Sequence, residues 1–153
     1  MQDRDSAITP GRVADLAEIG ELVSGAYGHY VERMGMPPGP MRTDYAVPLA
    51  AGQIEVLRAD GRIAGLLVLV PEPEHMLLDN VAVAPWAQGR GFGRRLMDHA
   101  EARARAAGYD RITLYTHVTM VENIEIYLRR GYVETHRAEV NGLHRVYMAK
   151  RLG

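Results

Sequence analysis

A glycine-rich turn between an apolar run and an amphipathic segment constrains this chain more than any other feature. The apolar run spans Leu77 to Val83, the turn is Gln88-Gly89-Arg90-Gly91-Phe92-Gly93, and an alanine-rich amphipathic segment follows from about Phe92 to Ala107. This order predicts a strand, a tight turn and the start of a helix. Such a junction directs unpaired backbone N–H groups and the positive end of a helix dipole at one point. The sequence therefore predicts a site for a phosphorylated ligand.

Two common phosphate-binding motifs do not fit the turn. The dinucleotide fingerprint G-x-G-x-x-G needs a third glycine where the chain has Arg94, and no acidic residue ends the next expected strand, Arg111 to Thr116. The Walker motif needs a lysine after its loop, but the sole lysine is Lys150. What remains is the pattern Q-x-x-G-x-G over residues 88–93.

The composition excludes several reaction classes and partners. The chain has no cysteine, neither Ser6 nor Ser24 lies in a G-x-S-x-G turn, and no two histidines show the i, i+4 spacing of a helical metal pair. We therefore expect no covalent enzyme intermediate and no metal cofactor. A net charge of −1 over 153 residues argues against nucleic acid and against an anionic membrane as partners.

The length and the ends of the sequence lead to expectations about organisation and location. At 153 residues we expect one domain over residues 1–153. No apolar run reaches the length of a membrane span, and Met1-Gln2-Asp3-Arg4-Asp5 lacks the basic and apolar regions of a signal peptide. A soluble, cytoplasmic protein is the expectation.

The pattern of apolar residues, prolines and glycines predicts alternating strands and helices. A first strand, Ala7 to Thr9, precedes a helix that Thr9 caps, with Pro10 in its first position, and that ends near Tyr27. Further strands are expected at 53–58, 62–70, 76–83, 111–116, 132–139 and 143–149, and helices at about 92–107 and 120–130. Asp60-Gly61 and Asn141-Gly142 are hairpin signals. This order predicts a mixed sheet flanked by helices.

Residues 25–48 interrupt this regular order. The segment is rich in glycine and proline, interleaved with tyrosine and methionine, and predicts short helical pieces joined by a loop. Loops of this length often close over a binding site, so a substrate lid is one interpretation. The other is that its tyrosines and methionines cap the sheet.

Two parts of the chain resemble a known family. The run Asn80 to Pro85, followed by residues 88–93 and Leu96-Met97, resembles the acetyl-CoA motif of the GNAT superfamily of N-acetyltransferases. Residues 120–132, with Glu122-Asn123, Tyr127 and Gly131-Tyr132, are similar to that family's downstream helix, and the order of elements matches over nearly the whole chain. The resemblance implies an α/β (α+β) fold, with a mixed, mostly antiparallel central sheet of about seven strands flanked by helices.

The resemblance also implies acetyl-CoA as the acyl-donor cosubstrate. The backbone of Val81, Ala82 and Val83 would pair with its pantetheine arm. The N–H groups of the turn would bind its pyrophosphate, and the donors would be those of Gly89, Arg90, Gly91, Phe92, Gly93 and Arg94. Gln88 is a further candidate for binding the cofactor. Asn123 is a further candidate contact, although the family's asparagine often stands where this chain has Met120, and Asn123 could instead be exposed. The alternative for the turn is an ordinary strand–helix connection with solvated arginines.

The implied chemistry needs an acid for the departing thiolate and a base for the amine. Tyr127 is the candidate general acid, because its position matches the family's tyrosine and a phenol stays protonated at neutral pH; it could instead pack with Ile124 and Leu128. An alkylamine with a pKa near 10.4 must lose a proton, for which His117, Asp79 and a water relay are candidates. A backbone N–H near Val81 would stabilise the oxyanion.

These inferences predict an N-acetyltransferase that moves the acetyl group of acetyl-CoA to a primary amine by direct attack in a ternary complex. The acceptor would be a small-molecule or peptide amine. Two other classes stay open: a non-catalytic module that binds or senses acyl-CoA, and a protein that binds an unrelated phosphorylated ligand. The C-terminal hairpin also leaves a homodimer open.

Overall fold

The strands form one continuous sheet that the sequence pattern largely anticipates. The computed structural model describes residues 6–153; residues 1–5, on which the expectation about a signal peptide depends, lie outside the described residues. The strands are β1 (Ala7–Pro10), β2 (Ile54–Ala59), β3 (Arg62–Pro71), β4 (Met76–Val83), β5 (Arg111–His117), β6 (Val133–Val140) and β7 (Leu143–Arg151). Their order in the sheet is β1-β2-β3-β4-β5-β7-β6, and every neighbouring pair is antiparallel except β4 and β5. The expected mixed, mostly antiparallel seven-stranded sheet is confirmed.

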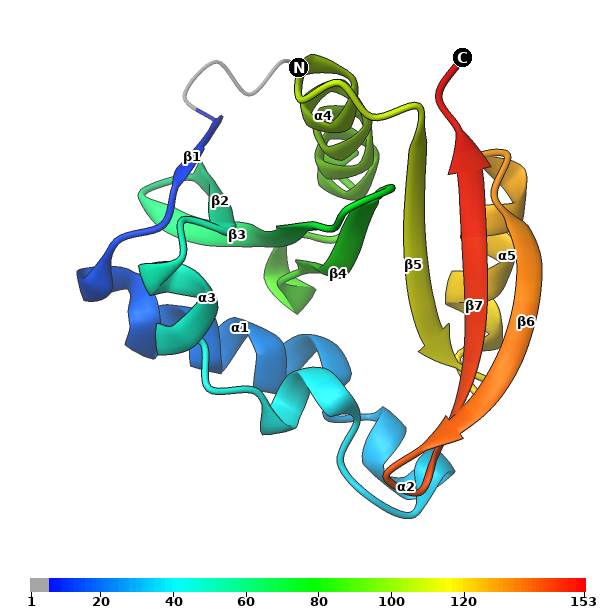
Figure 1. The fold of residues 1–153 in the computed structure, drawn as a ribbon. Coiled ribbons are helices and arrows are strands. Elements are labelled where there is room, and N and C mark those ends of the chain that lie inside the picture. The colour runs from blue at the N-terminus through cyan, green and yellow to red at the C-terminus, as the bar shows by residue number, and fades with distance from the viewer. Residues whose placement is uncertain (1–5) are drawn as a thin grey trace.

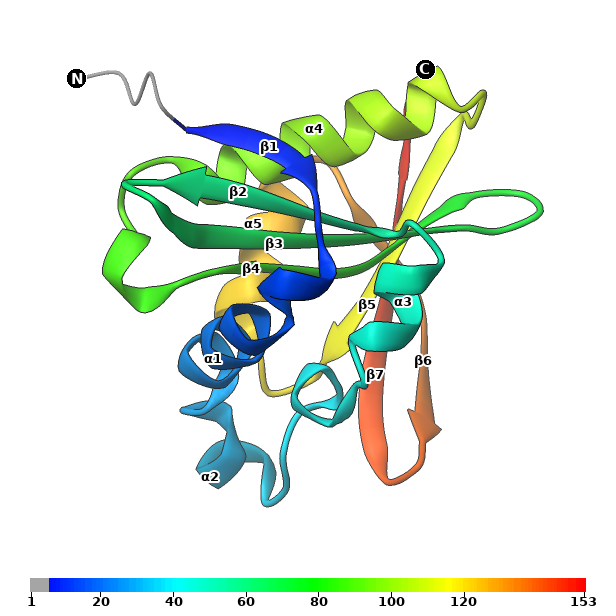
Figure 2. The same ribbon diagram turned by 90° about the vertical axis from the view of Figure 1, so that its left-hand side faces the viewer.

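Helices cover both faces of this sheet. They are α1 (Leu16–Tyr27), α2 (Tyr30–Met34), α3 (Ala46–Ala50), α4 (Phe92–Ala106) and α5 (Val121–Arg129). Figures 1 and 2 show α1 and α4 on opposite sides of β2, β3 and β4. Because β3 is covered on both faces, residues 63–69 are all buried, and the strand reads as an unbroken apolar run. The helix α4 completes this core with Leu96, Met97, Ala100 and Ala104.

The start of the first helix differs from the sequence prediction. Thr9 and Pro10 belong to β1, where they lie opposite Val56 and Glu55 of β2. The chain becomes helical only at a 3-10 turn, Val13–Asp15, which leads directly into α1. The predicted cap at Thr9 is therefore wrong, because pairing with β2 extends the strand past the proline. Pro10 is tolerated there because β1 is an edge strand.

The sheet is open between β4 and β5. The two strands pair only over Met76–Leu78 and Ile112–Leu114, although β4 continues to Val83 and β5 to His117. On the other side of β4, Leu69 lies opposite Leu78 and Val68 opposite Asn80, so that Asp79 is an extra, bulged residue. A bulge bends its strand. Figure 1 shows β4 and β5 diverging beyond their paired residues, and the candidate site lies in this opening.

Candidate active site

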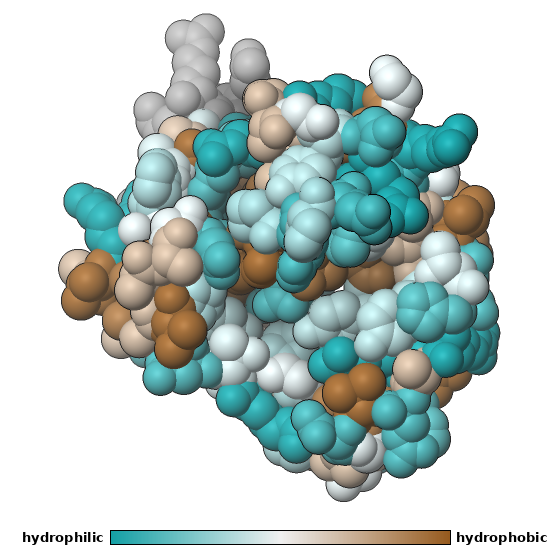
Figure 3. All heavy atoms as spheres, in the orientation of Figure 1, coloured by the Kyte–Doolittle hydropathy of each residue, from teal (hydrophilic) through white to brown (hydrophobic). Residues whose placement is uncertain are grey.

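Two neighbouring cavities occupy the opening between β4 and β5. The first, which we call the inner cavity, has a volume of about 160 Å³ and lies between the 34–45 segment, β4, β5 and β7. The second, which we call the groove, has a volume of about 600 Å³ and lies between the end of α1, β4, the start of α4 and α5. Figure 3 shows the surface hollowed near the middle of this face, with polar side chains along the rim.

The inner cavity and the groove meet at a small set of shared residues. Tyr27, Val81, Asn123 and Tyr127 line both of them. These residues come from α1, β4 and α5, so three separate elements converge where the cavities join. A ligand in the groove and a ligand in the inner cavity could therefore touch each other at this junction.

The glycine-rich turn has the backbone geometry of an anion site. Gly89 and Gly91 have φ values of 82° and 81°, and Gly91 is the N-terminal cap of α4. A Cβ at either position would meet no atom within 4 Å, so the left-handed backbone, and not crowding, requires glycine there. The first intrahelical bond runs from the Arg95 N–H to the Gly91 carbonyl at 3.1 Å, which leaves the N–H groups of residues 92–94 in the unpaired first turn.

The side chains around the turn contribute unequally. Gln88, Gly93 and Arg94 line the groove. The Arg90 guanidinium instead donates to Asp60 Oδ2 at 2.9 Å and lies over the Phe92 ring, which is itself buried in the core. Arg95 donates to Ser6. Of the three arginines at and just after the turn, only Arg94 therefore lines the groove.

The backbone of β4 presents alternate residues to the opening. The Ala84 N–H donates to the Ala64 carbonyl of β3 at 2.8 Å. Successive residues of a strand direct their N–H and C=O groups to opposite edges, so Ala82 also faces β3, whereas Val81 and Val83 face the opening. The Val81 carbonyl accordingly lies 3.1 Å from the Tyr27 hydroxyl, as the weaker of two acceptors that share its proton. The Val81 N–H and both backbone groups of Val83 are thus directed away from β3.

A chain of hydrogen bonds ties residues 25–48 to β4. The Tyr27 hydroxyl donates to Asn80 Oδ1 at 2.6 Å, the Asn80 amide donates to the Tyr45 hydroxyl at 3.0 Å, and that hydroxyl donates to the Pro40 carbonyl at 2.6 Å. Desolvation by burial raises the pKa of Tyr45 well above its usual value of about 10. The segment therefore forms one wall of the inner cavity, and the lid and capping interpretations both stay predictions.

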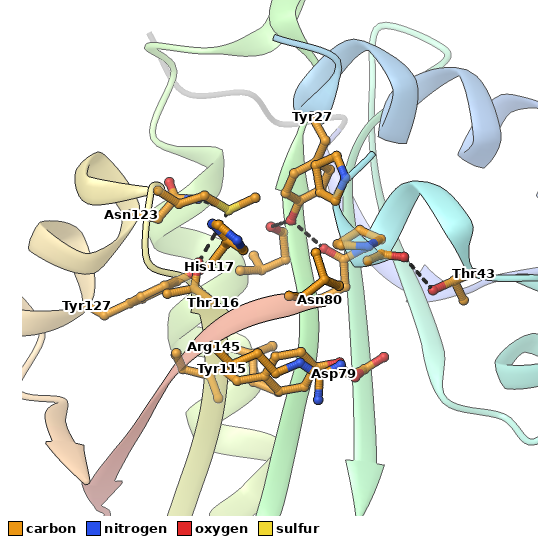
Figure 4. A pocket seen from close by; sticks show the side chains of 18 of the residues that line it. Tyr27, Thr43, Asp79, Asn80, Tyr115, Thr116, His117, Asn123, Tyr127 and Arg145 are labelled. Atoms are coloured by element: carbon orange, nitrogen blue, oxygen red, sulfur yellow. Dashed lines mark hydrogen bonds between the residues drawn. The ribbon is translucent and has the colours of Figure 1, made fainter. Parts of the chain in front are cut away.

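Tyr127 and Asn123 lie one helical turn apart on α5. Both side chains are half-buried at the junction of the cavities. Figure 4 shows them on the same side of the inner cavity as His117. Burial, with a smaller contribution from Tyr30, raises the pKa of Tyr127 to about 12. The Asn123 amide lies 3.9 Å from the sulfur of Met120. The expected acid is thus a protonated phenol that faces both cavities.

The two candidate bases line the inner cavity but differ in their bonding. Asp79, at the bulge of β4, accepts a hydrogen bond from the Tyr115 hydroxyl at 3.0 Å. His117 accepts the Thr119 N–H at Nδ1 at 3.1 Å, and burial, together with nearby His144, lowers the pKa of His117. Because Nδ1 is the acceptor, the proton of the neutral ring lies on Nε2. That tautomer leaves no free lone pair on the outer nitrogen.

Several residues of the site were not anticipated as functional from the sequence. Tyr45, Tyr115 and Arg145 all line the inner cavity. The Arg145 guanidinium lies 3.9 Å from the centre of the Tyr115 ring. Arg145 belongs to β7, opposite His117 of β5, and this pairing joins positions 28 residues apart that no local pattern connects. Tyr45 gave a weak signal as an aromatic residue in the 25–48 segment.

Two further features are absent from the part of the chain that the structure describes. Among residues 6–153, no group of three or more histidine, aspartate or glutamate side chains is arranged to hold a metal ion. No helix formed by the same residues is long and apolar enough to cross a membrane.

Comparison with known proteins identifies the family. Residues 29–132 match the family model described as the acetyltransferase (GNAT) family. The chain therefore belongs to the GNAT family of acetyltransferases. The fold agrees: the structure superposes on the ribosomal-protein-S18-alanine N-acetyltransferase of Escherichia coli with a TM-score of 0.77 and 18% identity, over 97% of this chain and 94% of that one. It superposes on the PaiA N-acetyltransferase of Thermoplasma acidophilum, solved in complex with coenzyme A, with a TM-score of 0.78 and 15% identity, over 96% and 99%.

Curated relatives match a shorter part of the chain. N-alpha-acetyltransferase 80 of Mus musculus is 36% identical over 93 residues, which are 61% of this chain and 25% of the relative. The amino-acid acetyltransferase of Ralstonia nicotianae is 41% identical over 80 residues, which are 51% of this chain and 17% of the relative. The chain thus spans a quarter or less of the length of these two relatives.

Proposed function

We propose that this protein transfers the acetyl group of acetyl-CoA to a primary amine by direct attack in a ternary complex. The observation that carries the proposal is the junction of the groove and the inner cavity at Tyr27, Val81, Asn123 and Tyr127. In this arrangement acetyl-CoA occupies the groove and the amine occupies the inner cavity. The two reacting atoms then meet at the junction, which supplies the proximity that a direct transfer needs.

The groove supplies the groups that hold the donor. The pyrophosphate lies on the first-turn N–H groups of α4 and beside Arg94, where the helix dipole and charge-assisted hydrogen bonds favour an anion. The backbone groups of Val83 bond the pantetheine arm. The Val81 N–H stabilises the oxyanion of the tetrahedral intermediate, because it points away from β3 into the junction.

Tyr127 protonates the departing thiolate. The amine nitrogen first forms its bond to the carbonyl carbon, which gives the tetrahedral intermediate. When the intermediate collapses, the carbon–sulfur bond breaks, the sulfur takes a proton from Tyr127, and the extra proton of the nitrogen passes to solvent, from which the Tyr127 hydroxyl is restored. With a pKa of about 12, the Tyr127 hydroxyl carries that proton throughout the neutral and mildly basic range. In the proposed complex, the Tyr127 side chain lies at the junction beside the sulfur.

Asp79 receives the proton that the ammonium of the acceptor must lose before its nitrogen can attack, directly or through one water. We choose Asp79 over His117 because the tautomer of His117 has no free lone pair toward the cavity, whereas a carboxylate that accepts one hydrogen bond has further acceptor sites. The location that we propose for this reaction is the cytoplasm.

Two measurements test the proposal. Calorimetry with CoA and acetyl-CoA tests the groove, and release of free thiol from acetyl-CoA with a panel of amines tests the transfer. Binding of CoA together with thiol release that depends on an amine is the expected result. Binding without thiol release would indicate an acyl-CoA-binding module without catalysis, and no binding by folded protein would end the proposal.

A further inference from the structure

Arg145 is the one half-buried arginine of the described residues that lacks a carboxylate partner. Among residues 6–153, the other two half-buried arginines have such partners: Arg58 pairs with Asp15 at 2.7 Å, and Arg130 pairs with Asp98 and Glu101 at 2.8 and 3.0 Å. The Arg145 guanidinium instead makes one hydrogen bond, from Nη1 to the Tyr147 hydroxyl at 3.3 Å. Its Nε is buried without a hydrogen-bond partner, as is that of Arg130, so the missing carboxylate is what distinguishes Arg145. A half-buried charge without a partner is costly, and a bound anion would remove that cost.

The surroundings hold the guanidinium in place at the wall of the inner cavity. Arg145 lies over the ring of Tyr115, and the hydroxyl of the same tyrosine donates to Asp79 (Figure 4). One aromatic ring therefore positions a cation at its face and a carboxylate at its edge. A guanidinium fixed by stacking is well suited to bidentate binding of a carboxylate.

From this arrangement we infer that the acetyl acceptor is a free amino acid or a similarly small amine with its own carboxylate, which Arg145 binds. The inference rests on the proposed acetyl transfer and adds the substrate class. The ammonium of such a zwitterion lies toward Asp79 and its carboxylate toward Arg145, so each charge meets its opposite. Asp79 beside the site disfavours a doubly charged phosphate as the anion.

The dimensions of the inner cavity agree with a small acceptor. Its volume of about 160 Å³ is close to that of an engineered protein cavity of about 150 Å³ that holds benzene. A peptide N-terminus carries an amide where the amino acid has its carboxylate. Binding a peptide would leave the guanidinium without its anion. Arg145 therefore selects against peptide acceptors.

The experiment compares α-amino acids with their carboxamides as acceptors, at a fixed concentration of acetyl-CoA and with thiol detection. The members of each pair differ only in the charge that Arg145 would bind. The variants are Arg145→Met, which removes the charge, and Arg145→Lys, which keeps the charge but loses the planar fork. Arg137→Met serves as the matched control, because Arg137 lies on the exposed strand β6 and pairs with Glu134.

We expect the wild-type protein to acetylate one or more amino acids and to use the matching carboxamides at least about tenfold less efficiently. Arg145→Met should raise KM for the amino acid by about 10- to 100-fold, with a much smaller change in kcat, and should alter the weak use of the carboxamide far less than the use of the amino acid. Arg145→Lys should recover part of the loss, and Arg137→Met should match the wild type. Stabilisation of Arg145→Met by CoA in thermal unfolding would show that the variant is folded.

Equal use of acids and amides, or an unchanged KM in folded Arg145→Met, would overturn this inference. Thiol release with other amines only would overturn it too, while leaving the proposed acetyl transfer in place. No thiol release with any amine would remove the proposed function, and this inference with it.

Discussion

The Tyr27 hydroxyl lies 2.6 Å from Oδ1 of Asn80, and this contact ties the last turn of α1 to the bulged part of β4. Asn80 is only 5% exposed, so its amide group depends on protein partners for its hydrogen bonds. It finds them in Tyr27 and Tyr45, both of which line the inner cavity. The position of this cavity wall is thus set by a buried polar network.

Removing the Tyr27 hydroxyl should therefore affect both stability and acetyl transfer. We expect Tyr27→Phe to lower the free energy of unfolding by about 0.5–1.5 kcal/mol and to lower kcat/KM, because the amide of Asn80 loses a partner at the junction. The matched control is Tyr109→Phe, which removes a hydroxyl bonded to the Glu72 carbonyl outside both cavities. Urea unfolding and thiol release measure the two effects. Equal kinetics for the two variants would refute a role for Tyr27 at the junction.

The general acid is tested by Tyr127→Phe. We expect kcat to fall by about 100-fold or more, while CoA still stabilises the variant against heat, because the change removes a proton donor and little binding surface. Tyr132→Phe is the control, since its ring lies 6.0 Å from that of Tyr127 but lines neither the inner cavity nor the groove. Turnover at the wild-type rate would remove Tyr127 from the mechanism.

The raised pKa of Tyr127 also predicts the shape of the pH profile. With a pKa of about 12, the phenol remains protonated through the pH where an ordinary tyrosine ionises, near 10. The value of kcat should therefore show no decline with an apparent pKa near 10. A decline at that pH in the wild type that disappears in Tyr127→Phe would contradict the prediction.

Substitution of the two candidate bases should affect kcat to very different extents. Asp79→Asn should lower kcat at pH 7 by about 100-fold, and its rate should rise more steeply with pH as more of the amine deprotonates in solution. His117→Gln should change kcat less than about threefold, because the lowered pKa of His117 keeps the ring neutral at pH 7 and its tautomer offers no acceptor. The reverse pattern would transfer the role to His117.

Two glycine-to-alanine substitutions separate backbone strain from helix propensity. Gly91→Ala should lower the free energy of unfolding by about 1–2 kcal/mol and weaken CoA binding, because φ is 81° at this position. Gly20→Ala, in the exposed face of α1 with no atom near the added Cβ, should raise stability by about 0.5–1 kcal/mol and leave CoA binding unchanged. Thermal unfolding and calorimetry measure both. Unchanged CoA affinity in Gly91→Ala would show that the backbone conformation of the turn is not needed for CoA binding.

The ionisation of the Asp15 carboxyl should make the stability of the protein depend on pH in the acid range. Its pKa is lowered mainly by the hydrogen bond from Arg58, with a further one from the Arg12 N–H. A lowered pKa means that this stabilisation is fully present above the usual value of about 3.9 and is lost as the pH falls through the folded-state pKa. Asp15→Asn should therefore cost about 1–3 kcal/mol at pH 7, and the difference should shrink in acid. A constant difference between pH 7 and pH 3 in urea titrations would contradict the linkage.

The order of the elements could be predicted because each local signal agrees with the fold. The buried strand β3, the hairpin glycines after Asp60 and Asn141, and the helix that begins at Phe92 all follow from patterns a few residues long. The cap at Thr9 failed because a partner strand, which begins 45 residues later at Ile54, competes for the same backbone. Long-range pairing of this kind is invisible to a local pattern.

The candidate site was predictable only in part for the same reason. The glycine turn is local, and so the groove around it was anticipated. The direction of Arg90 toward Asp60, by contrast, depends on a hairpin 30 residues away. The stacking of Arg145 on Tyr115 requires β5 and β7 to be neighbours, which only the assembled sheet establishes.

Because β4 pairs with β5 over a short stretch only, the sheet is weakly connected at this point. Three residue pairs are all that join the strands on either side of it, so the backbone groups of Val81 and Val83 have no protein strand beside them. A bound molecule with amide groups of its own could form hydrogen bonds with these backbone groups and fill the gap between the two strands. Binding of acetyl-CoA should then make the whole sheet more rigid. The sheet should be more mobile in the free protein than in the complex.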